Sequence, residues 1–294
     1  MATETRTISI GKKVHRYGKY WYKFKNNKLS IVGLGILIVL LLVAVFAPYI
    51  SPYPSNAGLF VDFSHALRSP SFAHPFGTDE DGRDVLTRVM FAFRYSFTLV
   101  GVVLGITVIP GVMLGLVSGY YVRRWFSIAI MRVADIFVAV PPLLLALSVA
   151  SVMRPTELNV LMAISLVWWP WYTRLVYSLT SSLRNEDYVR SAQLMGASSV
   201  RIMISEILPN ELGSILTKVS LDAGWVILIG AALSYVGLGA PPPTPDLGTM
   251  IAEGSSYLPS YWWIAVFPAI AVVMVILAFN LLGDGIRDTF SSSI

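Results

Sequence analysis

Six long apolar runs constrain what this chain can fold into more than any other feature of its sequence. They cover about residues 30–50, 96–121, 128–152, 158–177, 215–238 and 262–282. A helix needs about 20 residues to cross the hydrocarbon core of a bilayer, and each run reaches that length. Charged residues make up only 13% of the 294 residues, against about 25% in soluble domains. The sequence therefore predicts an all-α membrane protein with six transmembrane helices.

Two of the predicted spans contain prolines in their interior. Pro110 lies in the second, and Pro141-Pro142 lies in the third. Proline has no N–H to donate and frees a carbonyl one turn earlier, which membrane helices tolerate where neighbouring groups satisfy that carbonyl. We therefore expect a kink at each of these places.

The charge of the amino-terminal segment predicts its side of the membrane. Eight Lys and Arg residues but only one acid, Glu4, fall within residues 1–30, where they alternate with aromatic residues. A nucleic-acid-binding arm can have this composition, but bases and aromatics directly before a span are typical of a cytoplasmic juxtamembrane segment. We therefore predict a cytoplasmic amino terminus that contacts membrane lipid, and no nucleic-acid partner.

The short loops agree with this orientation. Arg123 and Arg124 follow the second run and further arginines follow the fourth, whereas loop 239–261 has Asp246 and Glu253 but no Lys or Arg. Because Lys and Arg accumulate on the cytoplasmic side, the first two loops are predicted inside and the third outside. An even number of spans then returns the carboxyl terminus to the cytoplasm.

These features divide the chain into three parts. Residues 1–29 form a basic cytoplasmic segment, and residues 30–95 hold the first transmembrane helix and an extracytoplasmic loop. Residues 96–294 form a five-helix core with a cytoplasmic loop over about residues 180–213. The protein is expected in the cytoplasmic membrane.

The second half of the extracytoplasmic loop has the pattern of a capped amphipathic helix. Thr78 or Asp79 can cap its start, since side-chain oxygens there accept from the first free N–H groups. Val85, Val89 and Phe93 recur at helical spacing and form an apolar stripe. We expect a helix on the membrane surface or against other helices, with direct substrate contact as the alternative.

Residues 188–210, YVRSAQLMGASSVRIMISEILPN, form the most informative polar stretch. Gly196 is predicted to stop a first helix, Ser198 or Ser199 to cap a second, and Pro209 to end it. Two short helices joined at a glycine would make a compact knob that can dock into a soluble partner. The alternative is a helical hairpin packed on its own bundle. The apolar side of the second helix is predicted to comprise Val200, Ile204, Ile207 and Leu208.

This stretch resembles the "EAA" coupling loop of ABC importer permeases, in which a small-residue helix is followed by a glycine and then by Leu-Pro. Ser191 and Ala192 fall at the two alanine positions, Gly196 at the glycine, and Leu208-Pro209 at the end. The resemblance implies an ATPase-coupling site formed by Tyr188, Arg190, Ser191, Ala192, Gly196, Ala197, Leu208 and Pro209.

Two positions of this loop depart from the pattern. Arg190 stands where many members have glutamate, and Glu206 stands where the pattern has isoleucine. No salt bridge from a glutamate at position 190 is therefore expected.

Four other segments indicate a narrower family within the ABC importer permeases. Residues 74–96, 132–147, 233–251 and 279–288 resemble, in the right order, segments of the C-type permease subunit of dipeptide, oligopeptide and nickel ABC importers. The resemblance implies the type I ABC importer permease fold and a chain that forms half of the translocation pathway for short peptides. It also implies a homologous B-type permease, two cytoplasmic ABC ATPase subunits and an extracytoplasmic substrate-binding protein as partners.

The chain itself has no G-x-x-x-x-G-K-[ST] phosphate-binding loop, the motif that cradles nucleotide phosphates. ATP and Mg are therefore expected on the partner ATPases, with no cofactor on this chain and no enzymatic activity of its own. The sequence contains no cysteine and only three scattered histidines, so we predict neither catalytic residues nor a metal site.

Charges inside the predicted spans are functional candidates by default. Asp135 is expected to pair with Arg132 one turn away, and Lys218 with Asp222 four residues away, while Arg174 is expected to extend toward the membrane surface. Close helix packing is the alternative role of small residues in these spans. The candidate translocation pathway comprises Asp135, Gly224, Gly230 and Ser234.

Two other functional classes fit less of the sequence. A stand-alone secondary transporter often shows internal repeats, and the coupling loop would have no role in it. A membrane-embedded enzyme would need a motif such as H-E-x-x-H or G-x-S-x-G, and neither occurs. Within the importer interpretation, oligosaccharides or nickel complexes remain alternatives to peptides.

Overall fold

The computed structural model describes residues 22–291, which are helices joined by loops, with no strand among them. The long helices are α2 (Lys28–Ile50), α3 (Val85–Tyr120), α6 (Glu157–Leu183), α9 (Leu208–Tyr235) and α11 (Trp263–Ser291). The shorter ones are α4 (Trp125–Val138), α5 (Pro142–Val152), α7 (Asp187–Leu194), α8 (Ser199–Arg201) and α10 (Leu247–Ser255). The loops add the 3₁₀ turns η1 (Pro54–Ala57) and η2 (Phe63–His65), and the π-helical turn η3 (Ile202–Ile207) precedes α9.

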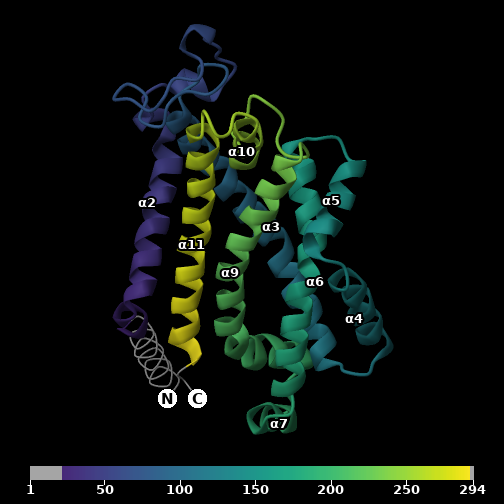
Figure 1. Ribbon diagram of the computed structural model, residues 1–294. Helices are drawn as coiled ribbons and strands as arrows, with labels where there is room; N and C mark the ends of the chain where they lie inside the picture. Colours follow the sequence, from purple (N-terminus) through teal and green to yellow (C-terminus); the bar gives the residue numbers. More distant parts are fainter. Residues whose placement is uncertain (1–21, 292–294) are drawn as a thin grey trace.

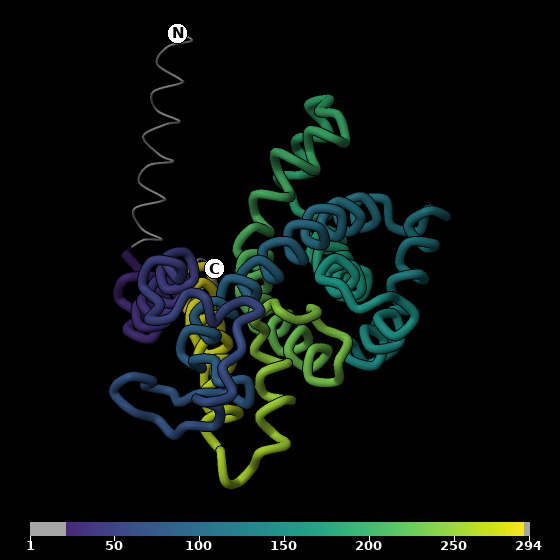
Figure 2. Tube along the Cα trace, turned by 90° about the horizontal axis from the view of Figure 1, so that it is seen from above, coloured from purple at the N-terminus to yellow at the C-terminus, as the bar shows by residue number. Residues whose placement is uncertain are grey.

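The long helices lie side by side in one bundle. Both views place α2 and α11 at one side, α4, α5 and α6 at the other, and α9 between them (Figures 1 and 2). The helix α7 projects beyond one end of the bundle, while α10 and the loop after α2 cover the opposite end (Figure 1).

Within residues 22–291, four helical stretches are long and apolar enough to cross a membrane. They are Lys28–Ile50, Val85–Tyr120, Ser199–Tyr235 and Trp263–Phe290. A fifth candidate is the pair α4 and α5, which is bent by 89° at a short break. The remaining long helix, α6, has 27 residues and corresponds to the fourth predicted run. The structure therefore confirms an all-α membrane protein, with four such stretches or five if the bent pair counts as one.

The two predicted proline kinks have different outcomes. The chain leaves the helix before Pro141, and Pro142 starts α5, a position where the missing N–H removes no helical bond. That interruption is confirmed. Pro110 lies inside α3, which continues as a helix to Tyr120, so the kink there stays a prediction.

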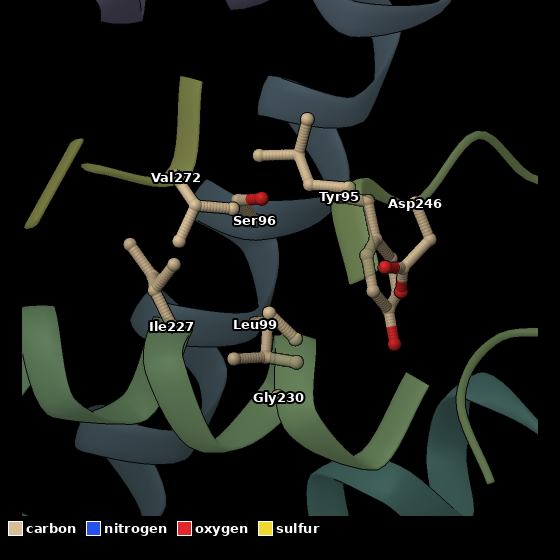
Figure 3. A pocket seen from close by; sticks show the side chains of 9 residues that line it. Tyr95, Ser96, Leu99, Ile227, Gly230, Asp246 and Val272 are labelled. Carbon is tan, nitrogen blue, oxygen red and sulfur yellow. The ribbon is translucent and has the colours of Figure 1, made fainter. Parts of the chain in front are cut away.

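The core is shared by the five long helices. Val103 of α3, Ile164 of α6, Val226 of α9 and Val275 of α11 are completely buried in one hydrophobic cluster. A cavity of about 10 Å³ remains at the contact between α3, α9 and α10, beside Gly230 (Figure 3), which is the size of roughly one water molecule. Packing in this region is therefore close.

A glycine stripe on α3 allows α6 to approach it closely. Gly111, Gly115 and Gly119 recur every four residues. A Cβ added at Gly115 would lie 2.6 Å from the Thr173 carbonyl oxygen and 2.8 Å from the Val176 Cβ. Small residues at this spacing let the backbones of membrane helices meet. The repeat was visible in the sequence but was not used in the prediction.

We expect Gly115→Ala to destabilise the protein, because its methyl group has no room against α6. Overpacking of this kind costs about 1–3 kcal/mol. Gly105→Ala on the same helix is the matched control, since an added Cβ there meets nothing within 4 Å. The check is the temperature at which each purified variant loses its monodisperse elution profile. Equal losses for the two variants would contradict the packing explanation.

The start of α3 corrects two predictions. The N-cap is Asp84, whose side chain accepts from the N–H of Thr87 at 2.8 Å, so neither Thr78 nor Asp79 caps this helix. The expected amphipathic helix and the second predicted span are one helix of 36 residues. The predicted boundary between residues 95 and 96 therefore lies inside α3.

The apolar stripe at the start of α3 faces the protein interior. Val85, Val89 and Phe93 are 0%, 3% and 4% exposed. Of the predicted alternatives, packing against other helices is therefore the one that the structure shows.

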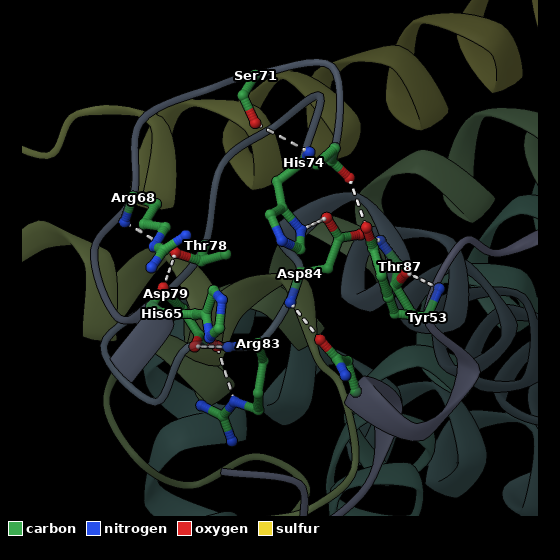
Figure 4. Close-up of polar contacts among 12 residues, drawn as sticks. Tyr53, His65, Arg68, Ser71, His74, Thr78, Asp79, Arg83, Asp84 and Thr87 are labelled. Atoms are coloured by element: carbon green, nitrogen blue, oxygen red, sulfur yellow. Dashed lines mark hydrogen bonds and ion pairs between the residues drawn. The ribbon is translucent and has the colours of Figure 1, made fainter. Parts of the chain in front are cut away.

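Thr78 and Asp79 instead hold the loop onto the bundle, and Figure 4 shows their polar contacts within the loop. The Asp79 carboxylate accepts from Arg83 Nε at 2.8 Å and from Arg88 Nη1 at 2.7 Å. The carbonyl of Thr78 accepts from the Trp263 indole at 3.2 Å. A folded unit therefore covers this end of the bundle, where the sequence predicted only an extracytoplasmic loop and one helix.

The same end of the molecule should become more stable as the pH falls. Burial raises the pKa of Glu80 and of Glu253, although Arg83 and Arg88 partly oppose this. A carboxyl whose pKa is higher in the folded state stabilises the fold below its unfolded value, about 4.5, and loses that contribution as the pH rises through the folded value. We therefore expect Glu80→Gln to show a smaller gain in unfolding temperature than the wild type as the pH falls from neutral toward about 4.5. Asp81→Asn on the same loop is the control, and an unchanged pH response in Glu80→Gln would contradict the assignment.

Candidate functional site

The helix–glycine–helix unit forms as the sequence predicts. The helix α7 ends before Gly196, whose φ of +81° lies in the left-handed region. The N–H of Gly196 donates to the carbonyl of Gln193 at 3.0 Å, and the N–H of Ala197 to that of Ala192 at 3.1 Å. This pair of bonds is the Schellman helix ending, which favours glycine at the left-handed position. An added Cβ would meet nothing within 4 Å, so the backbone angle alone requires glycine here.

The second helix starts as predicted but does not end as predicted. The Ser198 side chain accepts from the N–H of Arg201 at 3.4 Å and so caps α8. Pro209 does not terminate the helix, because the helical path continues from Ser199 to Tyr235.

The π turn explains why the helix can pass Pro209. Proline removes a helical hydrogen bond and clashes with the carbonyl one turn earlier. In η3 the N–H of Leu208 donates to Met203, five residues back, which is the bonding of a π turn. The side chain of Asn210 also donates to the carbonyl of Glu206 at 2.6 Å. The wider turn accommodates the proline.

One face of the unit is buried against the bundle. Val189 and Ile207 are fully buried, and Ala192 is 7% exposed, in a second hydrophobic cluster that includes Leu116 of α3 and Ile215 of α9. A further bond attaches it to the end of α3, since Gln193 Nε2 donates to the Tyr120 hydroxyl at 3.3 Å. The unit is therefore anchored on α3 and α9.

The opposite face of the unit is apolar and exposed. Leu194 is 90% exposed and Met195 81%, and Val200 and Ile204 are also exposed. We call these four side chains the apolar tip. The predicted apolar side of the second helix was wrong in part, because Val200 and Ile204 lie on the tip while Ile202 and Met203 are buried. The π turn changes the angular spacing of successive side chains, which a regular helical period does not anticipate.

The predicted coupling residues occupy different parts of this unit. Ala192 is buried, and Ala197 and Leu208 are half-buried. Exposed positions are Tyr188, Arg190, Ser191, Gly196 and Pro209. The arrangement is a rigid apolar projection, and an exposed apolar surface of this kind is typical of a protein-docking site.

Of the two ion pairs predicted inside the spans, one forms and the other does not. Lys218 Nζ lies 3.0 Å from Asp222 Oδ1, as predicted. Asp135, however, pairs with Arg174 at 2.6 Å and not with Arg132. The reason is that α4 packs beside α6, so that a residue 39 positions away in the chain is a closer partner than one on the preceding turn. Arg174 is thus bound across helices and does not simply extend to the surface.

The small candidate pathway residues lie in helix contacts. An added Cβ at Gly230 would be 3.1 Å from Leu99 of α3, and one at Gly224 would be 3.4 Å from Ile276 of α11. The Ser234 hydroxyl donates to Asp246 at 2.7 Å, and Asp246 caps α10. Within this chain these three residues support the packing alternative. Asp135 alone of the four lines an open groove.

A buried acid near the coupling unit was missed in the sequence. Glu211 is 1% exposed and accepts from the Thr180 hydroxyl of α6 at 2.6 Å. The available signal was an acid two residues after the Leu-Pro pair, at the start of an apolar run. Its hydrogen bond with Thr180 connects α9 to α6.

Comparison with known proteins identifies relatives over almost the whole chain. The family described as the binding-protein-dependent transport system inner membrane component matches residues 111–294. The N-terminal TM domain of oligopeptide transport permease C matches residues 17–70.

Individual relatives are similar over most of their length. The dipeptide transport system permease protein DppC of Alkalihalophilus pseudofirmus is 39% identical over 90% of this chain and 86% of its own. The di/tripeptide transport system permease protein DppC of Pseudomonas aeruginosa is 37% identical, with 92% and 90% covered. The dipeptide transport system permease protein DppC of Escherichia coli strain K12 is 38% identical, with 97% and 96% covered.

Proposed function

Because this chain belongs to the family of inner-membrane components of binding-protein-dependent transport systems, we propose that it is one permease subunit of an ATP-driven ABC importer for short peptides. The peptide assignment rests on relatives that are 37–39% identical and are named as dipeptide or di/tripeptide permeases. Oligosaccharides or nickel complexes are the alternative cargo of the same architecture. A stand-alone secondary transporter is a weaker candidate, because it leaves the projecting coupling unit without a role.

The observation that carries the proposal is the apolar tip. Leu194 and Met195 project from a unit whose other face is buried on α3 and α9. A soluble ATPase that receives the tip could transmit its closure to these helices as a rigid movement, which is how packed elements transmit a switch. We propose two such ATPase subunits, which would hold ATP and Mg, with no cofactor on this chain.

The proposed topology has six membrane helices. It counts the bent pair α4–α5 as one span and α6 as another, in addition to the four long apolar stretches. The start of α2, the end of α11 and the projecting α7 lie at the same end of the bundle (Figure 1). We assign that end to the cytoplasm, so both chain termini are cytoplasmic, as the basic segment 1–29 also predicts. Residues 1–21 lie outside the described part of the chain.

The folded unit over residues 51–84 and α10 would then face the other side, where a substrate-binding protein would dock. A homologous B-type permease would complete the pathway. We place its contact on the exposed face of α9, where Trp225 is 55% exposed, Leu228 43% and Tyr235 49%. Rocking of the two permeases between inward-open and outward-open states would move the peptide.

A site-specific cross-link tests the proposal. The chain contains no cysteine, so Leu194→Cys can carry a single thiol-reactive photo-cross-linker in native membranes. We expect it to capture an ABC ATPase subunit, identified by mass spectrometry. Phe72→Cys, fully exposed at the opposite end, is the control and should not capture that subunit. A Leu194→Cys protein that captures no ATPase would remove the coupling role and favour the secondary transporter.

A further inference from the structure

A basic groove lies between α4 and α6, near the end of the bundle that carries α7. It has a volume of about 440 Å³. Its charged lining consists of Arg123, Arg132, Arg174 and Asp135, accompanied by the hydroxyl groups of Ser178 and Ser181. Arg123 belongs to the short turn between α3 and α4, two residues after Tyr121, whose ring packs against that of Tyr120.

The groove has unpaired positive charge. Asp135 is already engaged by Arg174 at 2.6 Å. Among residues 22–291, neither Arg123 nor Arg132 makes an ion pair with a carboxylate within 4 Å. Three guanidinium groups therefore face one carboxylate, and guanidinium groups keep their charge at any pH a protein meets.

The backbone at Arg123 is also unusual. Its φ of +70° lies in the left-handed region, which residues other than glycine rarely adopt and which is often found at functional sites. The amino-terminal turn of the 14-residue α4 opens onto the same groove, since Ser127 and Ile128 line it. The free N–H groups and dipole of a helix start favour an anion.

The surface beside the groove is apolar. On α4, Trp125 is 80% exposed, Ile128 51% and Ile136 68%. Tryptophan is enriched at the headgroup level of membranes, and exposed isoleucines on a membrane helix can face acyl chains. An anion that occupied the groove would thus have hydrocarbon-facing surface beside it, which suits an amphiphile better than a free inorganic ion.

We propose that this groove binds the phosphate group of an anionic membrane phospholipid, with Arg123 and Arg132 as its principal charged contacts. Guanidinium groups bind phosphate oxygens through paired N–H donors, and Ser178 and Ser181 can donate further bonds. In the orientation proposed above, the site lies in the cytoplasmic leaflet, whose anionic lipids attract basic residues near the surface.

The test measures lipid retention by the assembled transporter. The complex is purified from its native membrane, exchanged into nanodiscs of equal parts phosphatidylglycerol and phosphatidylcholine, and washed with detergent before the retained lipids are quantified by mass spectrometry. We expect retained phosphatidylglycerol to exceed phosphatidylcholine. In Arg123→Gln/Arg132→Gln that preference should fall by about fivefold for each charge removed, the effect of one surface base on anionic lipid binding.

Two further variants make the result specific. Arg124→Gln removes a neighbouring charge that does not line the groove and should keep the preference. Arg123→Lys/Arg132→Lys keeps the charge and should retain most of the preference for phosphatidylglycerol, which separates lipid binding from a folding defect. A preference that survives in Arg123→Gln/Arg132→Gln, or that is lost equally in Arg124→Gln, overturns the proposal.

Inorganic phosphate distinguishes the two sources of the anion. If millimolar phosphate in phosphatidylcholine nanodiscs protects the Arg123 turn from proteolysis as well as phosphatidylglycerol does, the lipid is not the ligand. Protection by phosphatidylglycerol alone supports it. Retention of neither lipid above the other would also overturn the proposal.

Discussion

Gly196→Leu is expected to reduce uptake by the assembled importer strongly while the subunit still inserts and assembles. Leucine at a φ of +81° costs about 1–2 kcal/mol, because its Cβ crowds the carbonyl in the left-handed conformation. That cost lowers the ratio of the native to the non-native conformation of the unit by about 5- to 30-fold. Without the turn, the first helix would continue and the apolar tip at Leu194 and Met195 would point elsewhere. Uptake should therefore fall by about 5- to 30-fold, while the partner ATPases keep hydrolysing ATP without transport.

Gly196→Asn is the matched control, because asparagine adopts the left-handed conformation more readily than other non-glycine residues. It should keep most of the uptake. Uptake of radiolabelled peptide into proteoliposomes and ATP hydrolysis are measured on the same preparations. If asparagine were as damaging as leucine, the requirement would be close approach by the partner and not the backbone angle. Normal uptake by Gly196→Leu would contradict the coupling role itself.

Asp79→Asn is expected to unfold the unit that covers the opposite end of the bundle. The change leaves Arg83 and Arg88, whose side chains are 10% and 6% exposed, without their common carboxylate. Breaking a buried ion pair from one side costs about 3–5 kcal/mol. We expect the lower part of that range, because Glu80 and Glu253 remain 3.8 Å and 4.0 Å from the two guanidinium groups. The check is the rate of limited proteolysis within residues 51–84, together with the unfolding temperature.

Asp81→Asn provides the comparison for that variant. Asp81 also pairs with Arg83, at 2.8 Å, but its side chain is 31% exposed. A surface pair of this kind contributes about 0–1 kcal/mol, so proteolysis should stay near the wild-type rate. Similar behaviour of the two variants would mean that burial does not control the strength of this network.

The features that were predictable from the sequence are local or compositional. The lengths of the apolar runs indicated an all-α membrane protein, because a backbone inside a bilayer must satisfy its hydrogen bonds within the helix. Gly196 was recognisable because helix stops depend on the φ of one residue. The Lys218–Asp222 pair was predicted correctly because four residues along one helix fix the distance between the two side chains. The family was evident because its motifs occur as contiguous segments.

The features that were mispredicted depend on contacts between distant residues. Asp135 pairs with Arg174 because α4 and α6 lie together, which spacing within α4 does not reveal. Asp84 caps α3 because the loop folds so that Asn56 accepts from its N–H and His74 bonds its carboxylate.

Likewise, whether a small residue lines a pathway or a helix contact depends on what stands opposite it, and only the tertiary structure shows Leu99 beside Gly230 and Ile276 beside Gly224. The sequence by itself thus determined the fold class, the family and the turn that shapes the coupling unit, since these follow from backbone chemistry and chain order. The tertiary structure decided the partners of each charge, the start of α3 and which surfaces remain open, because these depend on where separate helices meet.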